Sequence, residues 1–419
     1  MISYADFRRF CMSKVKTNKS VFEPWKLGNL TLKNRIIKAA TFEGLAQGGV
    51  PDERLVQFHE KFAAGGAGVV TVAYGAVNDD ARTFDHQMCM QDDRIMDVLK
   101  KITSTIHKYG AVASLQLAHC GMQTRYSKLS SKPFSYSASW GLNPYGLLSG
   151  IPFMRPMPEK VIEQTCDDYA ISAKRAVEAG FDLLELHMGH GYLFSQFMSP
   201  AYNTRRDKFG GSLENRMRFP RLALRRVREA VGPGVPIVVK LNLQDGFEGG
   251  STLDDCIEAS KIIEQDGDAS LLVLTGGFSA KSPMYLFRGP SAIKPLIAIQ
   301  KNLIAKLVYT LAAKKFPDMP FKEMFFLDDA KKVRAAVNMP IALVGGIKSM
   351  ANFKTVMNED FDGIVLGRTL IHEPNLPKIY ESGEKSTSGC ISCNRCVAHI
   401  DSDDGVICPI NVEMASEAA

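Results

Sequence analysis

Eight short apolar runs that alternate with longer helical segments constrain the fold of this chain more than any other feature. The runs are rich in Val, Ile and Leu and cover residues 35–39, 68–73, 111–117, 181–186, 235–241, 270–274, 340–344 and 362–366. Continuous apolar runs of this length are typical of strands buried on both faces. Eight strand–helix units predict an α/β fold, a closed (β/α)8 TIM barrel. A doubly wound open sheet is the alternative, and it is weaker because no glycine-rich nucleotide turn follows the first strand.

The segments between the runs predict helices and two departures from the repeat. Helices are expected over 159–179, between Pro158 and Gly180, and over 213–231 and 252–266. Segment 121–157 is rich in Ser, Pro, Tyr and Gly and predicts a long loop after the third strand. Segment 288–325 interrupts the sixth unit, and its part 293–312 predicts one amphipathic helix, packed on the barrel or on a neighbouring subunit rather than on a membrane. We therefore expect one barrel domain, 1–380, and a short Cys-containing tail, 381–419.

Composition narrows the class of protein. Of the 419 residues, 45% are hydrophobic and 23% are charged, which is the balance of a globular enzyme. The formal net charge of +6 is too small to predict nucleic-acid binding. No run of about 18 apolar residues predicts a membrane span, and the basic first 20 residues lack the apolar core of a secretory signal. The nine cysteines are unevenly spread and form no secreted disulfide framework, so we expect a cytoplasmic protein acting on a small molecule, with homo-oligomer formation left open.

Polar and glycine residues gather where the predicted strands end, which in a barrel is the face that carries the active site. The third strand leads into Gln116 and His119, the fourth into His187, His190 and Tyr192, and the fifth ends near Lys240. The last two strands are followed by Gly345, Gly346, Gly367 and Arg368. Exposed backbone N–H groups at such glycines, together with an arginine, predict a phosphate site.

The histidines and the lysine each allow two readings. His187 and His190 are expected to donate hydrogen bonds to a substrate oxygen, with Tyr192 as proton donor. The alternative for the pair is a zinc site completed by His119. Lys240 could form a Schiff base in a flavin-free barrel lyase, or it could place a positive charge beside an anionic cofactor.

The chain resembles the Old Yellow Enzyme family of FMN oxidoreductases from about residue 27 to residue 374, and its barrel portion is similar to 2,4-dienoyl-CoA reductase. The matching motifs are LKNRI at 32–36, QLAHCG at 116–121, HMGHGYL at 187–193, NTR at 203–205 and FGGSLENR at 209–216. The resemblance implies an ene reductase. NAD(P)H would reduce bound FMN, and hydride would then pass from flavin N5 to an α,β-unsaturated carbonyl or a similar electron-poor substrate. A flavin-binding protein without catalytic activity is a further alternative.

The resemblance also implies a role for each site residue. FMN would lie against Ala40, Thr41 and Ala73, with Gln116 at its pyrimidine end, Lys240 near N1, and Gly345, Gly346, Gly367 and Arg368 at its phosphate. His187 and His190 would bind the substrate carbonyl or a phenolate, and Tyr192 would give the proton. Relatives carry Thr or Cys near the flavin C4 oxygen, where this chain offers Thr41 or Phe42. No Cys lies there, which argues against a covalently attached flavin.

Four cysteines in the tail are spaced as metal ligands often are. Cys390, Cys393, Cys396 and Cys408 could hold a [4Fe–4S] cluster or a zinc ion. Their spacing is similar to the cluster segment of the larger dienoyl-CoA reductase and amine dehydrogenase relatives, but two residues instead of three separate the second and third cysteines. We expect no metal, because the sequence given adds no further electron-carrying domain. NAD(P)H is then expected to reduce FMN directly.

Overall fold

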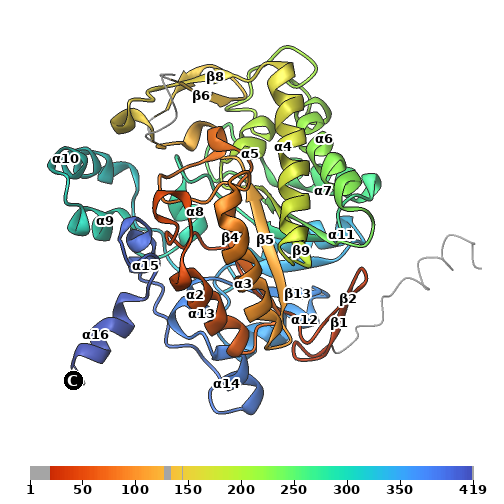
Figure 1. Cartoon of the computed structure of the whole chain (residues 1–419), viewed down its shortest axis with the longest axis vertical. Coiled ribbons are helices and arrows are strands. Elements are labelled where there is room, and N and C mark those ends of the chain that lie inside the picture. Colours follow the sequence, from red (N-terminus) through yellow and green to blue (C-terminus); the bar gives the residue numbers. More distant parts are fainter. Residues whose placement is uncertain (1–18, 127–133, 144, 418–419) are drawn as a thin grey trace, which may run out of the picture.

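Eight parallel strands close into a barrel in the computed structural model, which describes residues 19–126, 134–143 and 145–417 (Figure 1). The basic first residues considered above, Arg8 to Lys16, lie outside the described part. The barrel strands are β3 (Ile36–Lys38), β4 (Val69–Ala76), β5 (Val112–Ala118), β9 (Leu183–Met188), β10 (Ile237–Asn242), β11 (Leu271–Thr275), β12 (Ile341–Val344) and β13 (Gly363–Leu366). Each overlaps one predicted run, so the (β/α)8 barrel is confirmed and the open sheet was the wrong alternative.

Helices surround the barrel and connect its strands, as the alternating pattern predicts. They are α2 (Glu53–Ala64), α3 (Met96–His107), α4 (Glu159–Glu178), α6 (Leu213–Val231), α7 (Leu253–Asp266), α11 (Leu327–Ala336), α12 (Met350–Asn358), α13 (Arg368–His372) and α14 (Leu376–Ser382). Local signals explain the predicted bounds of α6 and α7. The Ser212 side chain caps α6, and Thr252 and Asp255 form a capping box at the start of α7.

Smaller elements complete the barrel ends. The hairpin of β1 (Trp25–Leu27) and β2 (Leu30–Leu32) packs Trp25 and Leu27 against residues inside the barrel such as Val238. The connections also contain α5 (Leu193–Met198), α8 (Pro283–Phe287) and the short 3-10 helices Gln47–Gly49, Asp79–Ala81 and Asp93–Ile95. Among the described residues, no helix combines the length and the apolar content that crossing a bilayer requires.

The described parts of the predicted loop 121–157, which leave out 127–133 and 144, contain regular structure, so the prediction of a loop was wrong there. It contains the 3-10 helices Gly121–Gln123 and Leu147–Ser149, and a three-stranded sheet of β6 (Phe134–Ser137), β7 (Gly141–Leu142) and β8 (Phe153–Pro156) in the order β6-β8-β7. In β6 the buried positions are Ser135 and Ser137, while the aromatic residues between them are partly exposed. Phe, Ser, Tyr and Ser alternate, but four residues are the lower limit for such a signal, and the Ser, Pro and Gly residues around them favour a loop instead.

The predicted single helix 293–312, within the segment that interrupts the sixth unit, consists of two helices, so that prediction was wrong. α9 (Ile293–Ile299) and α10 (Leu303–Ala312) are separated at Asn302, whose side chain accepts a hydrogen bond from the Ala305 N–H at 3.0 Å and starts α10. A 3-10 turn, Ala313–Lys315, follows. α9 packs against α15 (Arg395–Ala398), whereas α10 lies at the edge of the molecule (Figure 1).

The tail folds back onto the barrel. After α14 it forms α15, a 3-10 turn at His399–Asp401 and α16 (Pro409–Glu417). The Ser388 N–H donates to the Lys348 carbonyl, and the Val406 N–H donates to the Glu43 carbonyl, each at a distance of 2.8–2.9 Å. These bonds tie the tail to the same face of the barrel as the strand ends.

Candidate active site

A cavity of about 320 Å³ opens at the carboxyl ends of the barrel strands, within the size range of ligand sites, about 300–1,000 Å³. All but one of the predicted site residues line it: Ala40, Thr41, Gln116, His187, His190, Tyr192, Lys240, Gly345, Gly346, Gly367 and Arg368. Ala73 lies behind the wall, where its N–H donates to the Glu43 carboxylate at 3.0 Å. No described residue that lines the cavity is acidic, so the cavity is suited to an anion.

Three polar rings cluster where β9 turns into α5. The ring centroid of His187 lies 4.8 Å from that of His190 and 4.7 Å from that of Tyr192. His190 adopts the left-handed backbone conformation, with φ of 56°, and Gly191 follows with φ of 75°. A Cβ atom at Gly191 would approach the Phe278 ring to 2.3 Å, so only glycine fits this turn. A left-handed conformation at a non-glycine residue is uncommon and clusters at functional sites.

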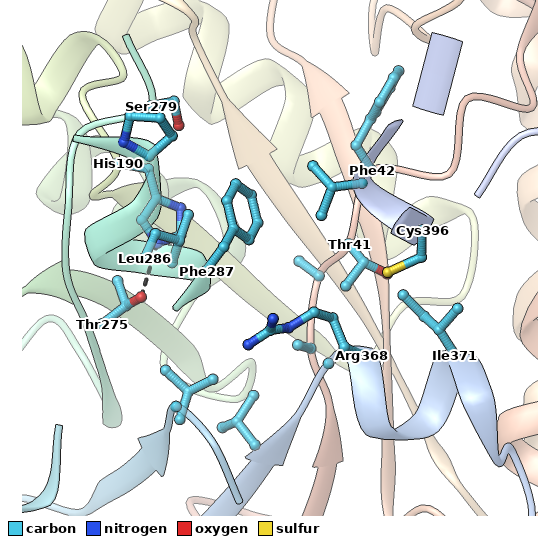
Figure 2. Close-up of a pocket in the computed structure, with 18 of the residues that line it drawn as sticks. Thr41, Phe42, His190, Thr275, Ser279, Leu286, Phe287, Arg368, Ile371 and Cys396 are labelled. Atoms are coloured by element: carbon cyan, nitrogen blue, oxygen red, sulfur yellow. Dashed lines mark hydrogen bonds between the residues drawn. The ribbon is translucent and has the colours of Figure 1, made fainter. Parts of the chain in front are cut away.

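The two histidines are neutral near neutral pH. Burial lowers the pKa of both imidazoles well below their usual range, and the nearby Lys240 ammonium lowers them further. Nδ1 of His187 accepts the Gly189 N–H at 3.4 Å, which leaves the remaining ring proton on Nε2. Nε2 of His190 lies 2.8 Å from the Thr275 hydroxyl, an interaction drawn in Figure 2. The pair thus presents neutral hydrogen-bonding groups to the cavity.

Tyr192 belongs to a chain of three hydroxyl groups. Its phenol oxygen is 2.8 Å from that of Tyr74, and the Tyr74 hydroxyl donates to the Thr83 hydroxyl at 3.0 Å. Burial raises the pKa of Tyr192, so the phenol keeps its proton until a stronger base approaches. The sequence prediction included Tyr192 but missed Tyr74 and Thr83, because the partners come from the second barrel unit and no local spacing links them.

A buried carboxylate that the prediction missed connects two of the predicted cofactor residues. Glu185 lies 3.5 Å from the Lys240 ammonium and accepts a 2.5 Å hydrogen bond from the Gln116 amide. Glu185 and His187 are two residues apart on β9 and so share one face of the strand. That spacing was the available signal for Glu185.

The opposite wall of the cavity carries the predicted anion site. Gly345 and Gly346 end β12 with positive φ angles of 115° and 69°, and Gly367 and Arg368 follow β13. Arg368 donates to the Asn394 side-chain oxygen and, at 3.2 Å, to the Arg288 carbonyl. Burial lowers the pKa of its guanidinium, and no acidic residue of the described chain forms an ion pair with it. Figure 2 shows this side chain reaching from the start of α13 into the cavity.

This wall fits the phosphate of FMN. A guanidinium that is removed from water and has no carboxylate partner favours an anionic ligand. The Thr41 hydroxyl, which lines the same cavity, is buried without a hydrogen-bond partner in the described structure, as expected for a group that contacts a ligand.

The cysteine tail forms part of the cavity wall through Cys390, Ser392, Cys396 and further apolar residues. All four tail cysteines also border a second, smaller cavity beside Arg368. In the described part of the chain no cysteine forms a disulfide, and no group of three or more His, Cys, Asp or Glu side chains is arranged to hold a metal ion. His119, the third residue of the zinc alternative, instead accepts the Gly121 N–H at 3.0 Å and is outside the cavity lining.

Comparisons with known proteins identify the family of the chain. The model of the NADH:flavin oxidoreductase / NADH oxidase family matches residues 20–277. The 4,4'-dithiodibutanoate disulfide reductase of Rhodococcus erythropolis is 37% identical over 91% of this chain and 93% of that protein. An NADH oxidase of Thermoanaerobacter brockii is 30% identical, and the chain spans 53% of its length.

Solved structures show the same fold. A 2-naphthoyl-CoA reductase has a TM-score of 0.78 and 24% identity, covering 96% of this chain and 58% of that one. The Old Yellow Enzyme homologue from Zymomonas mobilis has a TM-score of 0.69 and 22% identity, covering 90% and 96%. The family match identifies a flavin-dependent NAD(P)H oxidoreductase. The flavin-free lyase, the alternative reading of Lys240, was therefore wrong. The chain belongs to the NADH:flavin oxidoreductase / NADH oxidase family, among the relatives of Old Yellow Enzyme.

Proposed function

We propose that this enzyme holds FMN in the barrel cavity and transfers hydride from reduced flavin to an α,β-unsaturated carbonyl. The observation that carries the proposal is the cluster of His187, His190 and Tyr192 on one cavity wall, where the ring centroids of His190 and Tyr192 each lie less than 5 Å from that of His187. A substrate oxygen and the carbon that needs a proton are only a few bonds apart in an enone, so one cluster can serve both. Bound FMN would supply the two-electron redox chemistry, with NAD(P)H as the source of hydride.

Different residues of the cavity would contact the phosphate and the ring system of FMN. Arg368, with backbone N–H groups at Gly345, Gly346 and Gly367, would hold the phosphate. Gln116, Thr41 and Ala40 would contact the ring system, and Lys240 would balance negative charge on reduced flavin. Ala73 remains a weaker prediction, because it lies outside the cavity lining.

The histidines are suited to binding the substrate oxygen. As neutral donors they polarise a carbonyl without first exchanging a proton with solvent. Because negative charge grows on this oxygen as the β-carbon accepts hydride, hydrogen bonds from imidazole N–H groups strengthen as the reaction proceeds.

Tyr192 is suited to protonating the α-carbon. Its raised pKa makes the phenolate costly, so the proton must be replaced as soon as it leaves. The Tyr74 and Thr83 hydroxyls provide that replacement, since a chain of hydroxyl groups can reverse its hydrogen-bond direction.

Replacing Tyr192 tests the proposal. Tyr192→Phe is expected to slow enone reduction about 10²–10⁴-fold, the usual contribution of a general acid, while NADH still reduces the flavin at the wild-type rate. Stopped-flow absorbance separates the two half-reactions. Tyr169→Phe is the matched control, because Tyr169 is buried away from the cavity and its hydroxyl has no partner in the described structure. Wild-type enone turnover by Tyr192→Phe would remove Tyr192 as the acid.

The disulfide reductase from Rhodococcus favours a second candidate substrate class. Hydride and one proton would break an S–S bond and give two thiols, so the electrons and atoms balance. A thiolate leaves with a pKa of about 8.5 and needs little help from an acid. Tyr192→Phe should therefore slow reduction of 4,4'-dithiodibutanoate much less than reduction of an enone. Comparing both substrates with the same variant distinguishes the two classes.

A further inference from the structure

Helix α10 turns its large apolar side chains away from the protein. Leu303, Ile304, Leu307 and Leu311 are 80%, 68%, 60% and 71% exposed. Their spacing places them on one side of the helix, and the residue buried on the other side is the small Ala305. A surface helix normally buries its apolar stripe. α10 therefore exposes its apolar face instead of burying it, and no element in the described part of the chain covers that face.

The positive charge of the whole chain is concentrated around this helix. Residues 288–317 contain six basic residues and no acidic residue, which gives a local charge of +6. The whole chain has 51 basic and 45 acidic residues, so the other 389 residues are balanced at 45 of each. Lys301, Lys306 and Lys314 are exposed, and none of the three forms an ion pair within the described structure.

We propose that the α10 surface, consisting of these four apolar side chains with Lys301, Lys306 and Lys314, binds an anionic lipid membrane. An apolar face bordered by lysines is the arrangement of helices that lie in the membrane interface, with the apolar side among acyl chains and the cations at anionic headgroups. This is a peripheral contact and requires no spanning helix.

Charge favours a lipid surface over a second copy of the chain. In a two-fold pair the same patch meets itself, so the lysines of one copy would lie near those of the other. Segment 288–317 offers no acidic residue to compensate them. Anionic headgroups supply the missing negative charge.

The inner side of the same insertion reaches the active-site cavity. The Tyr309 hydroxyl of α10 accepts a 3.4 Å hydrogen bond from Arg125, next to the barrel mouth. Phe321 and Phe325, further along the insertion, line the cavity. Membrane contact through α10 would therefore hold the cavity close to the lipid surface, which gives apolar substrates a short path into it.

Vesicle flotation with the FMN-loaded protein tests the proposal independently of its activity. We expect binding to phosphatidylglycerol vesicles and little binding to phosphatidylcholine vesicles. Substituting Lys301, Lys306 and Lys314 with Gln should weaken binding on the order of a hundredfold, because each lysine near an anionic surface contributes about fivefold. Leu303→Ser with Leu307→Ser and Leu311→Ser should abolish it. The control carries Ile171→Ser, Lys160→Gln and Lys174→Gln on α4, which also exposes an apolar residue and lysines.

Two outcomes would overturn the proposal. One is vesicle binding that does not depend on lipid charge, or that persists after the leucine substitutions. In either case the protein must retain its flavin and its circular dichroism spectrum. The other is no vesicle binding, with a dimer in sedimentation equilibrium that the leucine substitutions dissociate, which would assign the surface to a second copy.

Discussion

The two walls of the cavity are completed in different ways. On the wall of His187 and His190, the partner groups come from the barrel itself, as Thr275 on β11 does for His190. On the wall of Arg368, the partners are Asn394 in the tail and the Arg288 carbonyl at the start of the insertion. The register of the barrel therefore fixes the groups proposed for chemistry, whereas the anion side depends on two segments outside the repeat. Changes on the two walls should affect different steps.

Arg368→Met is expected to show the largest difference between the two walls, because it should affect FMN binding and not enone turnover. Loss of charge-assisted hydrogen bonds to a phosphate should raise the Kd for FMN about 10²-fold. Enone turnover at saturating FMN should stay close to the wild-type rate. Fluorescence titration of the apoprotein with FMN measures the affinity. Arg395→Met is the control, because Arg395 lies in the same tail but pairs with Glu413 at the surface. Equal affinity in both variants would contradict a phosphate at Arg368.

His187→Ala should affect binding at the substrate position and not FMN affinity. Phenols are expected to bind over oxidised flavin as phenolates and give a long-wavelength charge-transfer band, since imidazole donors favour an anionic oxygen. Loss of one donor should weaken phenol binding by about tenfold and leave FMN affinity unchanged. Absorbance titration with a phenol measures this. If phenol affinity were unaffected, the histidine wall would not be the substrate site.

A smaller effect is expected on stability at acid pH. Both histidines stay neutral in the folded protein because burial lowers their pKa, while in the unfolded chain they take up protons below about pH 6.5. The unfolded state then binds more protons, so each histidine reduces the free energy of unfolding by up to about 1.4 kcal/mol per pH unit as pH falls from 6.5. Urea unfolding measured between pH 6.5 and 5 gives the free energy of unfolding at each pH. This free energy should fall less steeply with decreasing pH in the double variant His187→Gln with His190→Gln than in the wild type.

The smallest effect is expected in the tail thiols. Hydride passes from nicotinamide to flavin in one step and needs no one-electron carrier, so Cys393→Ser should reduce its FMN with NADH within about threefold of the wild-type rate. Iron and sulfide analysis after anaerobic purification accompanies the measurement. About four irons per chain, lost together with flavin reduction in the variant, would show that the four cysteines around the smaller cavity act in electron transfer.

Sequence alone predicted what depends on short-range pattern. The apolar runs identify all barrel strands, and their ends locate the polar residues of both walls. The small sheet escaped prediction because its strands have at most four residues and lie in a segment rich in Ser, Pro, Tyr and Gly. The break before α10 depends on one capping side chain, Asn302.

Partners from distant segments were also missed. Tyr74 meets Tyr192 across 118 residues, and Asn394 meets Arg368 across 26. Such contacts exist only after the barrel closes, so no local spacing reveals them. Glu185 was also missed, although its alternation with His187 on β9 offered a local signal.

The contribution of the tail to the cavity has a consequence for biosynthesis. Cys390, Ser392 and Asn394 leave the ribosome after all eight barrel strands, so the barrel can close before its anion wall is complete. A nascent chain at that stage presents Arg368 without its Asn394 partner. With Arg368 holding the FMN phosphate as proposed, stable capture of FMN would wait for the tail to dock, and cofactor loading would be one of the last events in maturation.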